Sequence, residues 1–200
     1  MLIAHPDFSA RIEALVGELE RATDAEIVVV AARRSGGYRD IPWLAGAMGA
    51  LLALGVVLYS PLSFSEATTP VYLLATGALC AWFSARSDAL LRRLTRAARR
   101  RRQVEQAARA AFVEEAVHGT RGRSGILVYV SEAERLAVLV RDLGLDGRVP
   151  RAAWNGLDLG VADLEDLLVL LRAVGAVLAA HLPATADNPN EIPDAPRVRS

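Results

Sequence analysis

The sequence predicts an α/β domain that is interrupted by a membrane-spanning helical hairpin. Two apolar blocks, 41–59 and 71–85, carry no charged side chain and are separated by a short polar break. Two runs rich in β-branched residues, EIVVVAA at 26–32 and ILVYV at 126–130, are typical of strands buried on both faces. The strands lie on opposite sides of the apolar blocks, so we expect a domain assembled from two separated parts of the chain.

Residues 1–40 are predicted to form the first part of this domain. Apolar residues recur at helical spacing over 6–22, which indicates an amphipathic helix. A short polar break separates that helix from the strand at 26–32. The glycine-containing segment 33–40 is interpreted as a loop that leads into the first apolar block.

The apolar blocks predict a transmembrane helical hairpin over 41–85. At about 1.5 Å per residue the block 41–59 spans roughly 28 Å, which matches a hydrocarbon core of about 30 Å. The block 71–85 spans only about 22 Å by the same rise. We expect it to cross the bilayer through local thinning or through Arg86, whose long side chain reaches the interface.

The distribution of charge predicts the orientation of the hairpin. Basic residues flank both blocks, whereas the connecting loop holds one acid, Glu66, and no basic residue. By the positive-inside rule both termini are expected in the cytoplasm. Seven arginines after the second block are expected to contact the anionic headgroups of the bilayer, each contributing about 1 kcal/mol. These are Arg92, Arg93, Arg96, Arg99, Arg100, Arg101 and Arg102.

Residues 86–182 are predicted to hold a juxtamembrane arginine-rich helix and the remainder of the domain. The segment 86–117 lacks glycine and proline and is interpreted as one long helix, or two with a kink. Residues 135–141 follow the strand at 126–130 after a short link, which predicts an antiparallel pair. The strands before and after the hairpin are joined through helix and are predicted to be parallel neighbours.

The C-terminal part is predicted to contain a loop, a core helix and a tail. Residues 143–159 are interpreted as a loop anchored by Trp154. Residues 160–182 are predicted to form a helix with three acids in its first turns. Its apolar stretch 167–182 follows these acids and is interrupted by Arg172, which favours a buried core helix over a third span. The segment 183–200 contains four prolines and mixed charge and is predicted to be an irregular tail.

Composition excludes several classes of function. The 23 basic and 23 acidic residues balance, so the chain has no overall attraction for nucleic acid, and no aromatic residue accompanies the arginine run. The single cysteine, Cys80, excludes an intrachain disulfide. The three histidines are far apart, which supports neither a metal site nor a nucleophile dyad.

A metal site would require several converging oxygen ligands. Asp142 and Asp146 follow the third predicted strand in a glycine-containing loop and are the candidate ligands. We expect Arg123, Arg135 and Arg141 to compete for such acids as ion pairs. The residues therefore identify no catalytic group, and we expect no cofactor. The alternative is a bound divalent cation.

Three segments, in their order and spacing, resemble the TPM-domain family. They are DAEIVVVAARRSGGYRD at 24–40, RSGILVYVSEAERLAVLVRDLGL at 123–145, and Trp154 with the terminal helix. Within the family the chain is similar to a bacterial subgroup in which two spans interrupt the domain, and whose tail carries a segment like Asn188–Glu191. The resemblance implies an αβα sandwich in a multi-pass protein of the cell inner membrane.

The resemblance also implies two functional expectations. Some family members are metal-dependent acid phosphatases that hold the metal through acids near the strand ends. Where such members carry Asp-Asn before the glycine of the second strand, this chain has Arg123–Ser124, which replaces a carboxylate by a cation. We therefore expect a non-catalytic interaction or assembly module at the membrane, with a membrane protein as a candidate partner. A weak metal-dependent acid phosphatase is the alternative.

Overall fold

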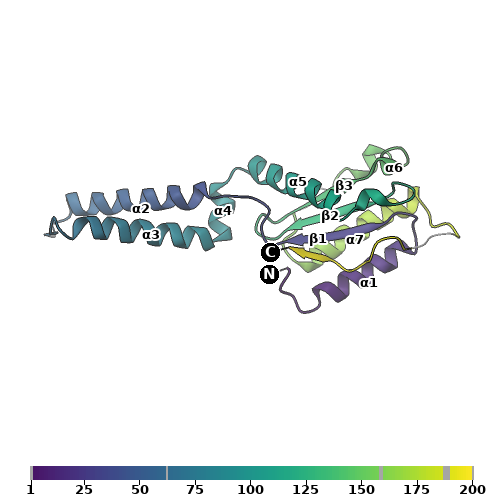
Figure 1. Cartoon of the computed structure of the whole chain (residues 1–200), viewed down its shortest axis with the longest axis horizontal. Helices are drawn as coiled ribbons and strands as arrows, with labels where there is room; N and C mark the ends of the chain where they lie inside the picture. The colour runs from purple at the N-terminus through teal and green to yellow at the C-terminus, as the bar shows by residue number, and fades with distance from the viewer. Residues whose placement is uncertain (1, 62, 158–159, 187–189, 200) are drawn as a thin grey trace. The chain divides into compact units, whose positions relative to one another are not determined.

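The computed structural model describes residues 2–61, 63–157, 160–186 and 190–199, and its chain splits into two compact units (Figure 1). The sheet unit comprises residues 1–36 and 100–200. The helix-pair unit comprises residues 37–99. The mixture of helices and a mixed sheet confirms the predicted α/β class.

The described part of the sheet unit forms a four-stranded mixed sheet in the order β3-β2-β1-β4 (Figure 1). Strands β1 (Ile27–Ala32) and β2 (Ile126–Ser131) pair in parallel, although the whole helix-pair unit separates them in sequence. Strand β3 (Leu136–Arg141) is antiparallel to β2, and β4 (Arg197–Arg199) is parallel to β1. The predicted parallel pair and antiparallel pair are both confirmed.

Helices cover both faces of this sheet, which explains why β1 and β2 show no polar alternation. Every residue of these two strands is buried. Helices α1 (Phe8–Glu20) and α7 (Leu164–His181) pack on the face that includes Val29. Helix α5 (Ala97–Glu114) packs on the other face, which includes Val28.

Local capping explains where the helices differ from the prediction. Helix α7 is a core helix, as predicted, but it begins at Leu164 because the Asp163 carboxylate accepts the N–H of Asp166 at 3.0 Å. The segment 86–117 divides into α4 (Asp88–Leu94) and α5, with a break at Thr95. This agrees with the second of the two expectations for that segment.

The segment 143–159 is less irregular than predicted. It contains the short helix α6 (Leu143–Asp146) and the 3₁₀ turn η2 (Arg151–Trp154). Trp154 is 9% exposed and packs into the core with α1 and α7, so its predicted role as an apolar anchor is confirmed.

The prediction of an irregular tail over 183–200 is wrong at its end, because Arg197–Arg199 forms β4. The Arg199 guanidinium contacts the Glu114 carboxylate at 2.5 Å and the Glu115 carboxylate at 2.7 Å. These partners lie at the end of α5 and directly after it, far away in sequence, so the composition of the tail could not reveal them. Asn188 and Pro189, part of the segment used in the family resemblance, lie outside the described residues.

The helix-pair unit consists of α2 (Asp40–Tyr59), α3 (Thr69–Arg86) and α4. Helices α2 and α3 lie side by side (Figure 1) and approach closely at two glycines, since a Cβ on Gly46 would stand 3.0 Å from the carbonyl oxygen of Gly77. The unit extends beyond the predicted 41–85 because Tyr38 and Leu91 form a small buried cluster with Ile41.

One described helix, α2, is long and apolar enough to cross a membrane by length and composition alone. Its mean hydropathy over 18 residues is 2.1, and 11% of that window is buried. Helix α3 does not meet the same criterion among the described residues. Both predicted spans therefore stay predictions, and among the described helices α2 alone meets this criterion.

Candidate functional site

The candidate metal ligand Asp142 is buried and fully engaged by protein groups. Its carboxylate accepts hydrogen bonds from Arg123 Nε at 3.1 and 3.2 Å and from Arg123 Nη2 at 3.0 Å. It also caps α6 by accepting the N–H of Leu143 at 2.7 Å. Asp142 is 2% exposed, so these contacts occupy the oxygens that a metal would need.

Arg123 holds this ion pair from a constrained loop. Its backbone has φ of +50°, in the left-handed region that is unfavourable for a residue with a Cβ. The loop is fixed because the N–H of Gly144 donates to the carbonyl of Arg123 at 2.9 Å. A Cβ on Gly144 would lie 2.2 Å from the carbonyl oxygen of Gly122, so glycine is required for this approach.

The second candidate ligand, Asp146, pairs with a different arginine from the one that holds Asp142. Its carboxylate pairs with Arg141 at 3.5 Å and remains half-exposed. Within the described ranges, no group of three or more His, Cys, Asp or Glu side chains is placed to hold a metal ion. The predicted competition from Arg123 and Arg141 is confirmed.

Asp146 lines a groove of ≈470 Å³ beside strand β3, which we call the β3 groove. One wall is helix α5, which contributes Arg101 and Arg109. The opposite wall is η2, which contributes Arg151 and Trp154. The remaining lining residues are Glu105, Asn155 and the β3 residues Val138, Leu139, Val140 and Arg141.

The β3 groove carries an excess of positive charge. Its four arginines exceed its two acids, Glu105 and Asp146, by two, although the whole chain has no net charge. The guanidinium of Arg141 stands 5.0 Å from the centre of the Trp154 ring, a cation–π distance. The Trp154 indole N–H is buried and has no hydrogen-bond acceptor among the described residues.

The arginines predicted to contact the membrane surface lie on two helices and the break between them. Arg92 and Arg93 are in the last turn of α4, Arg96 follows the break, and the others begin α5. Carboxylates of the protein engage Arg99 and Arg101. Arg99 binds the Asp40 carboxylate at 2.5 and 2.8 Å, and Arg101 binds Glu105 at 2.9 Å.

A polar network lies where the parallel strands β1 and β2 end, the edge at which open α/β sheets bind ligands. The buried Glu134 carboxylate accepts the N–H groups of Ser35 and Gly36 at 3.2 Å and the hydroxyl of Ser131. The Ser35 hydroxyl in turn donates to Ser131 Oγ at 2.7 Å. The network fixes the chain immediately before the helix-pair unit begins at Gly37, so its observed role is structural.

Two buried carboxylates lie at the opposite ends of these strands. Glu26 accepts the N–H groups of Glu191 at 3.1 Å and Ile192 at 3.2 Å, which anchors these two tail residues to the start of β1. Glu20 accepts the N–H of Ile27 at 2.8 Å. Burial, with the nearby negative charges of Glu26 and Asp194, raises the pKa of Glu20 to about 8. Burial also raises the pKa of Glu26.

Sequence reasoning missed the β3 groove and the two buried carboxylates. Arg101, Arg141 and Trp154 come from three separate segments, and no local spacing connects them. Glu20 occupies a helix end and would be assigned to solvent on composition. A usable signal was Glu26, because a carboxylate directly before a buried strand needs partners that neutralise it.

Comparisons with known proteins give a likeness of fold. No protein-family model matches the chain, and no curated protein matches it. Among solved structures, the chain is similar to the NMR structure of BA42 protein from the psychrophilic bacterium Bizionia argentinensis. The TM-score is 0.55 at 15% sequence identity, and the match covers 95% of this chain and 91% of that chain. At this identity the likeness shows a shared fold alone.

Proposed function

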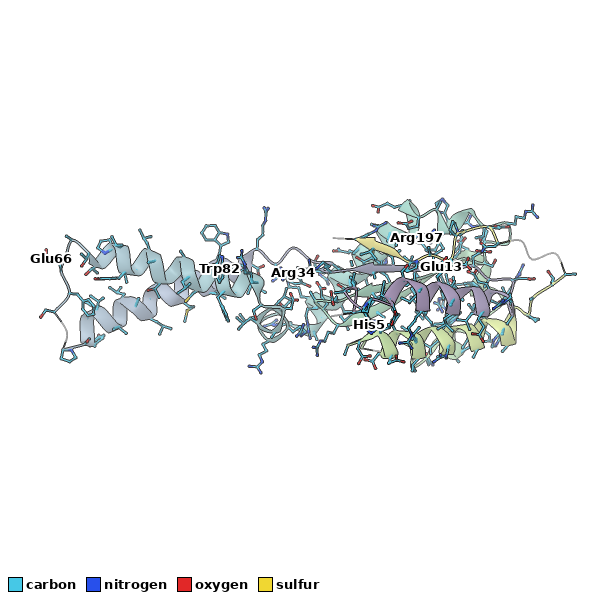
Figure 2. The ribbon with its side chains drawn as sticks, turned by 90° about the horizontal axis from the view of Figure 1, so that it is seen from below. His5, Glu13, Arg34, Glu66, Trp82 and Arg197 are labelled. Carbon is cyan, nitrogen blue, oxygen red and sulfur yellow. The ribbon has the colours of Figure 1, made fainter. Side chains whose placement is uncertain are left out.

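We propose that this protein is a two-span protein of a bacterial inner membrane whose cytoplasmic TPM-like αβα domain acts as a non-catalytic interaction or assembly module. The observation that carries the proposal is the outward apolar surface of the helix-pair unit. Leu51 is 61% exposed and Trp43 80%, and Trp82 points away from the helix pair (Figure 2). Exposed apolar surface of this extent is unfavourable in water and favourable in lipid.

The shorter helix α3 has features of a second span. Its 18 residues extend about 27 Å, longer than its apolar block, because Thr69, Pro70 and Arg86 add to the helix. At its other end the Arg86 guanidinium lies 4.2 Å from the centre of the Trp82 ring. An arginine that reaches outward beside a tryptophan is typical of the membrane interface.

The contacts of the candidate ligands support a non-catalytic role for the domain. Asp142 is held by Arg123, the residue that stands where the phosphatases of the TPM-domain family carry a carboxylate. Asp146 is held by Arg141. A divalent cation would have to displace both guanidinium groups, whereas a protein-binding surface needs no such displacement.

The predicted topology is tested by labelling two introduced cysteines in a Cys80→Ala background. Glu66→Cys lies in the loop between α2 and α3, and Glu13→Cys lies on the exposed side of α1 (Figure 2). In intact spheroplasts a membrane-impermeant maleimide is expected to label Glu66→Cys and to leave Glu13→Cys unlabelled until the cells are permeabilised. Labelling of both cysteines to the same extent in intact spheroplasts would contradict two spans with cytoplasmic termini.

The absence of phosphatase activity is tested with the purified full chain. Calcium or magnesium is expected to leave the thermal unfolding midpoint of the sheet unit unchanged, because a cation without a site gives no stabilisation by mass action. Release of phosphate from a phosphate ester is expected to equal that of Asp142→Asn, which retains the shape of the side chain. Metal-dependent release that Asp142→Asn abolishes would establish the phosphatase alternative instead.

A further inference from the structure

The outer edge of β3 has backbone groups that are directed away from the sheet. The backbone N–H of Asp142 donates to the carbonyl of Gly125 at 2.9 Å, so the backbone groups of Asp142 point toward β2. The backbone N–H and C=O groups of successive residues in an antiparallel strand point to opposite edges of the strand. Those of Ala137, Leu139 and Arg141 therefore point away from β2. Consistent with this alternation, the carbonyl of Arg135 accepts the N–H of Val161 on the outer side at 3.3 Å.

No strand in the described part of the chain pairs with this outer edge. Open edges are normally protected by lysine, proline or a bulge, because an unpaired edge attracts another strand. Strand β3 reads LAVLVR and contains none of these, and its charged residue is at its end. The edge is thus suited to accept one more strand.

The arginines in the walls of the β3 groove favour a negatively charged strand at this edge. Arg101 and Arg109 lie on the α5 side and Arg151 on the η2 side, and the groove has an excess of two positive charges. In an extended peptide every second side chain points the same way, about 6.8 Å apart. Carboxylates at that spacing can approach the arginines of one wall, of which α5 carries two, while the peptide backbone pairs with β3. A further acceptor can satisfy the buried indole N–H of Trp154.

We propose that the β3 groove binds an extended acidic segment of a partner polypeptide, which adds to the sheet as a fifth strand beside β3. This inference rests on the interaction role proposed above and specifies the chemistry of the partner. An anionic lipid headgroup would use the same arginines, but it has no regular series of N–H and C=O groups to match Ala137, Leu139 and Arg141. The open edge therefore favours a polypeptide.

The probe is a fluorescein-labelled peptide of alternating glutamate and valine, and the protein is the full chain in nanodiscs of zwitterionic phosphatidylcholine. Fluorescence anisotropy is expected to show saturable binding that weakens at least tenfold in the double variant Arg109→Ala, Arg151→Ala. Arg172→Ala removes an exposed arginine from α7, outside the groove, and is expected to leave binding unchanged.

Two N-methylated peptides separate strand addition from simple charge attraction. One is methylated at its glutamates and the other at its valines, so each has lost the N–H groups of one peptide edge. Only one edge can pair with β3, so one methylated peptide is expected to lose binding at least tenfold and the other to retain it. Equal binding of both, or displacement of the peptide by phosphatidylglycerol in the nanodisc, would overturn the proposal in favour of a general anion site.

Self-association is a further outcome that would overturn the proposal. If the chain forms dimers that the acidic peptide does not dissociate, the edge of β3 belongs to a second copy. Failure of this inference is distinguishable from failure of the proposed function, because the labelling of Glu66→Cys and the phosphate-release assay do not depend on the groove.

Discussion

Replacing Leu51 with arginine is expected to prevent stable insertion of the helix-pair unit into membranes. Leu51 lies near the middle of α2 and is 61% exposed, so in a bilayer its side chain would face lipid. Arginine at the centre of a span costs about 3 kcal/mol relative to leucine, which corresponds to roughly a 100-fold loss in the insertion equilibrium. The measurement is the fraction of the protein that remains in the membrane pellet after alkaline carbonate extraction.

A matched variant shows whether this effect depends on position. Leu143 in α6 is 71% exposed and belongs to the sheet unit, so Leu143→Arg introduces the same chemistry outside the proposed membrane segment. It is expected to extract like the wild type. If α2 faced water instead, Leu51→Arg would leave the pellet fraction unaltered, and this result would refute the membrane proposal.

Replacing Glu20 with glutamine is expected to remove much of the pH dependence of stability of the sheet unit. The pKa of Glu20 is raised to about 8 when folded, above its ordinary value of 4.5. Between these values the folded state binds more protons, so the contribution of Glu20 is fully present below pH 4.5 and is lost as the pH rises through 8. The free energy of unfolding should fall by about 2 to 3 kcal/mol between pH 5.5 and 7.5.

Trp154 fluorescence in a Trp43→Phe, Trp82→Phe background follows the sheet unit during urea unfolding in detergent. Glu20→Gln retains an acceptor for the N–H of Ile27, so its curve should be much flatter, with a remainder from the raised pKa of Glu26. Glu18→Gln, on the exposed side of the same helix, should keep the wild-type slope. Equal slopes in wild type and Glu20→Gln would show that Glu20 does not carry the effect.

The central elements of the fold could be predicted because their signals are local. The β-branched runs at 26–32 and 126–130 lack polar alternation, which suits only strands covered on both faces, and the structure confirms this. The break at Thr95 had no glycine or proline to mark it, so the sequence could not choose between one helix and two. Strand β4 is short and charged, and its pairing with β1 leaves no local pattern.

The candidate site was predictable only in part. Arginine competition for Asp142 and Asp146 could be expected because the arginines flank the same strands. The β3 groove could not be predicted from the sequence, because its walls come from α5 and η2, which are distant in the chain.

By itself, the sequence determined the central strands, the core helix α7 and a long apolar helix at α2, because these depend on neighbouring side chains. Only the tertiary structure decided which carboxylates are engaged, since Arg123 and Asp142 are 19 residues apart and Glu191 and Glu26 are 165 apart. It also decided which sheet edge stays open, because β4 covers β1 while no described strand covers β3. Both outcomes follow from long-range packing, which brings together groups that no local pattern connects.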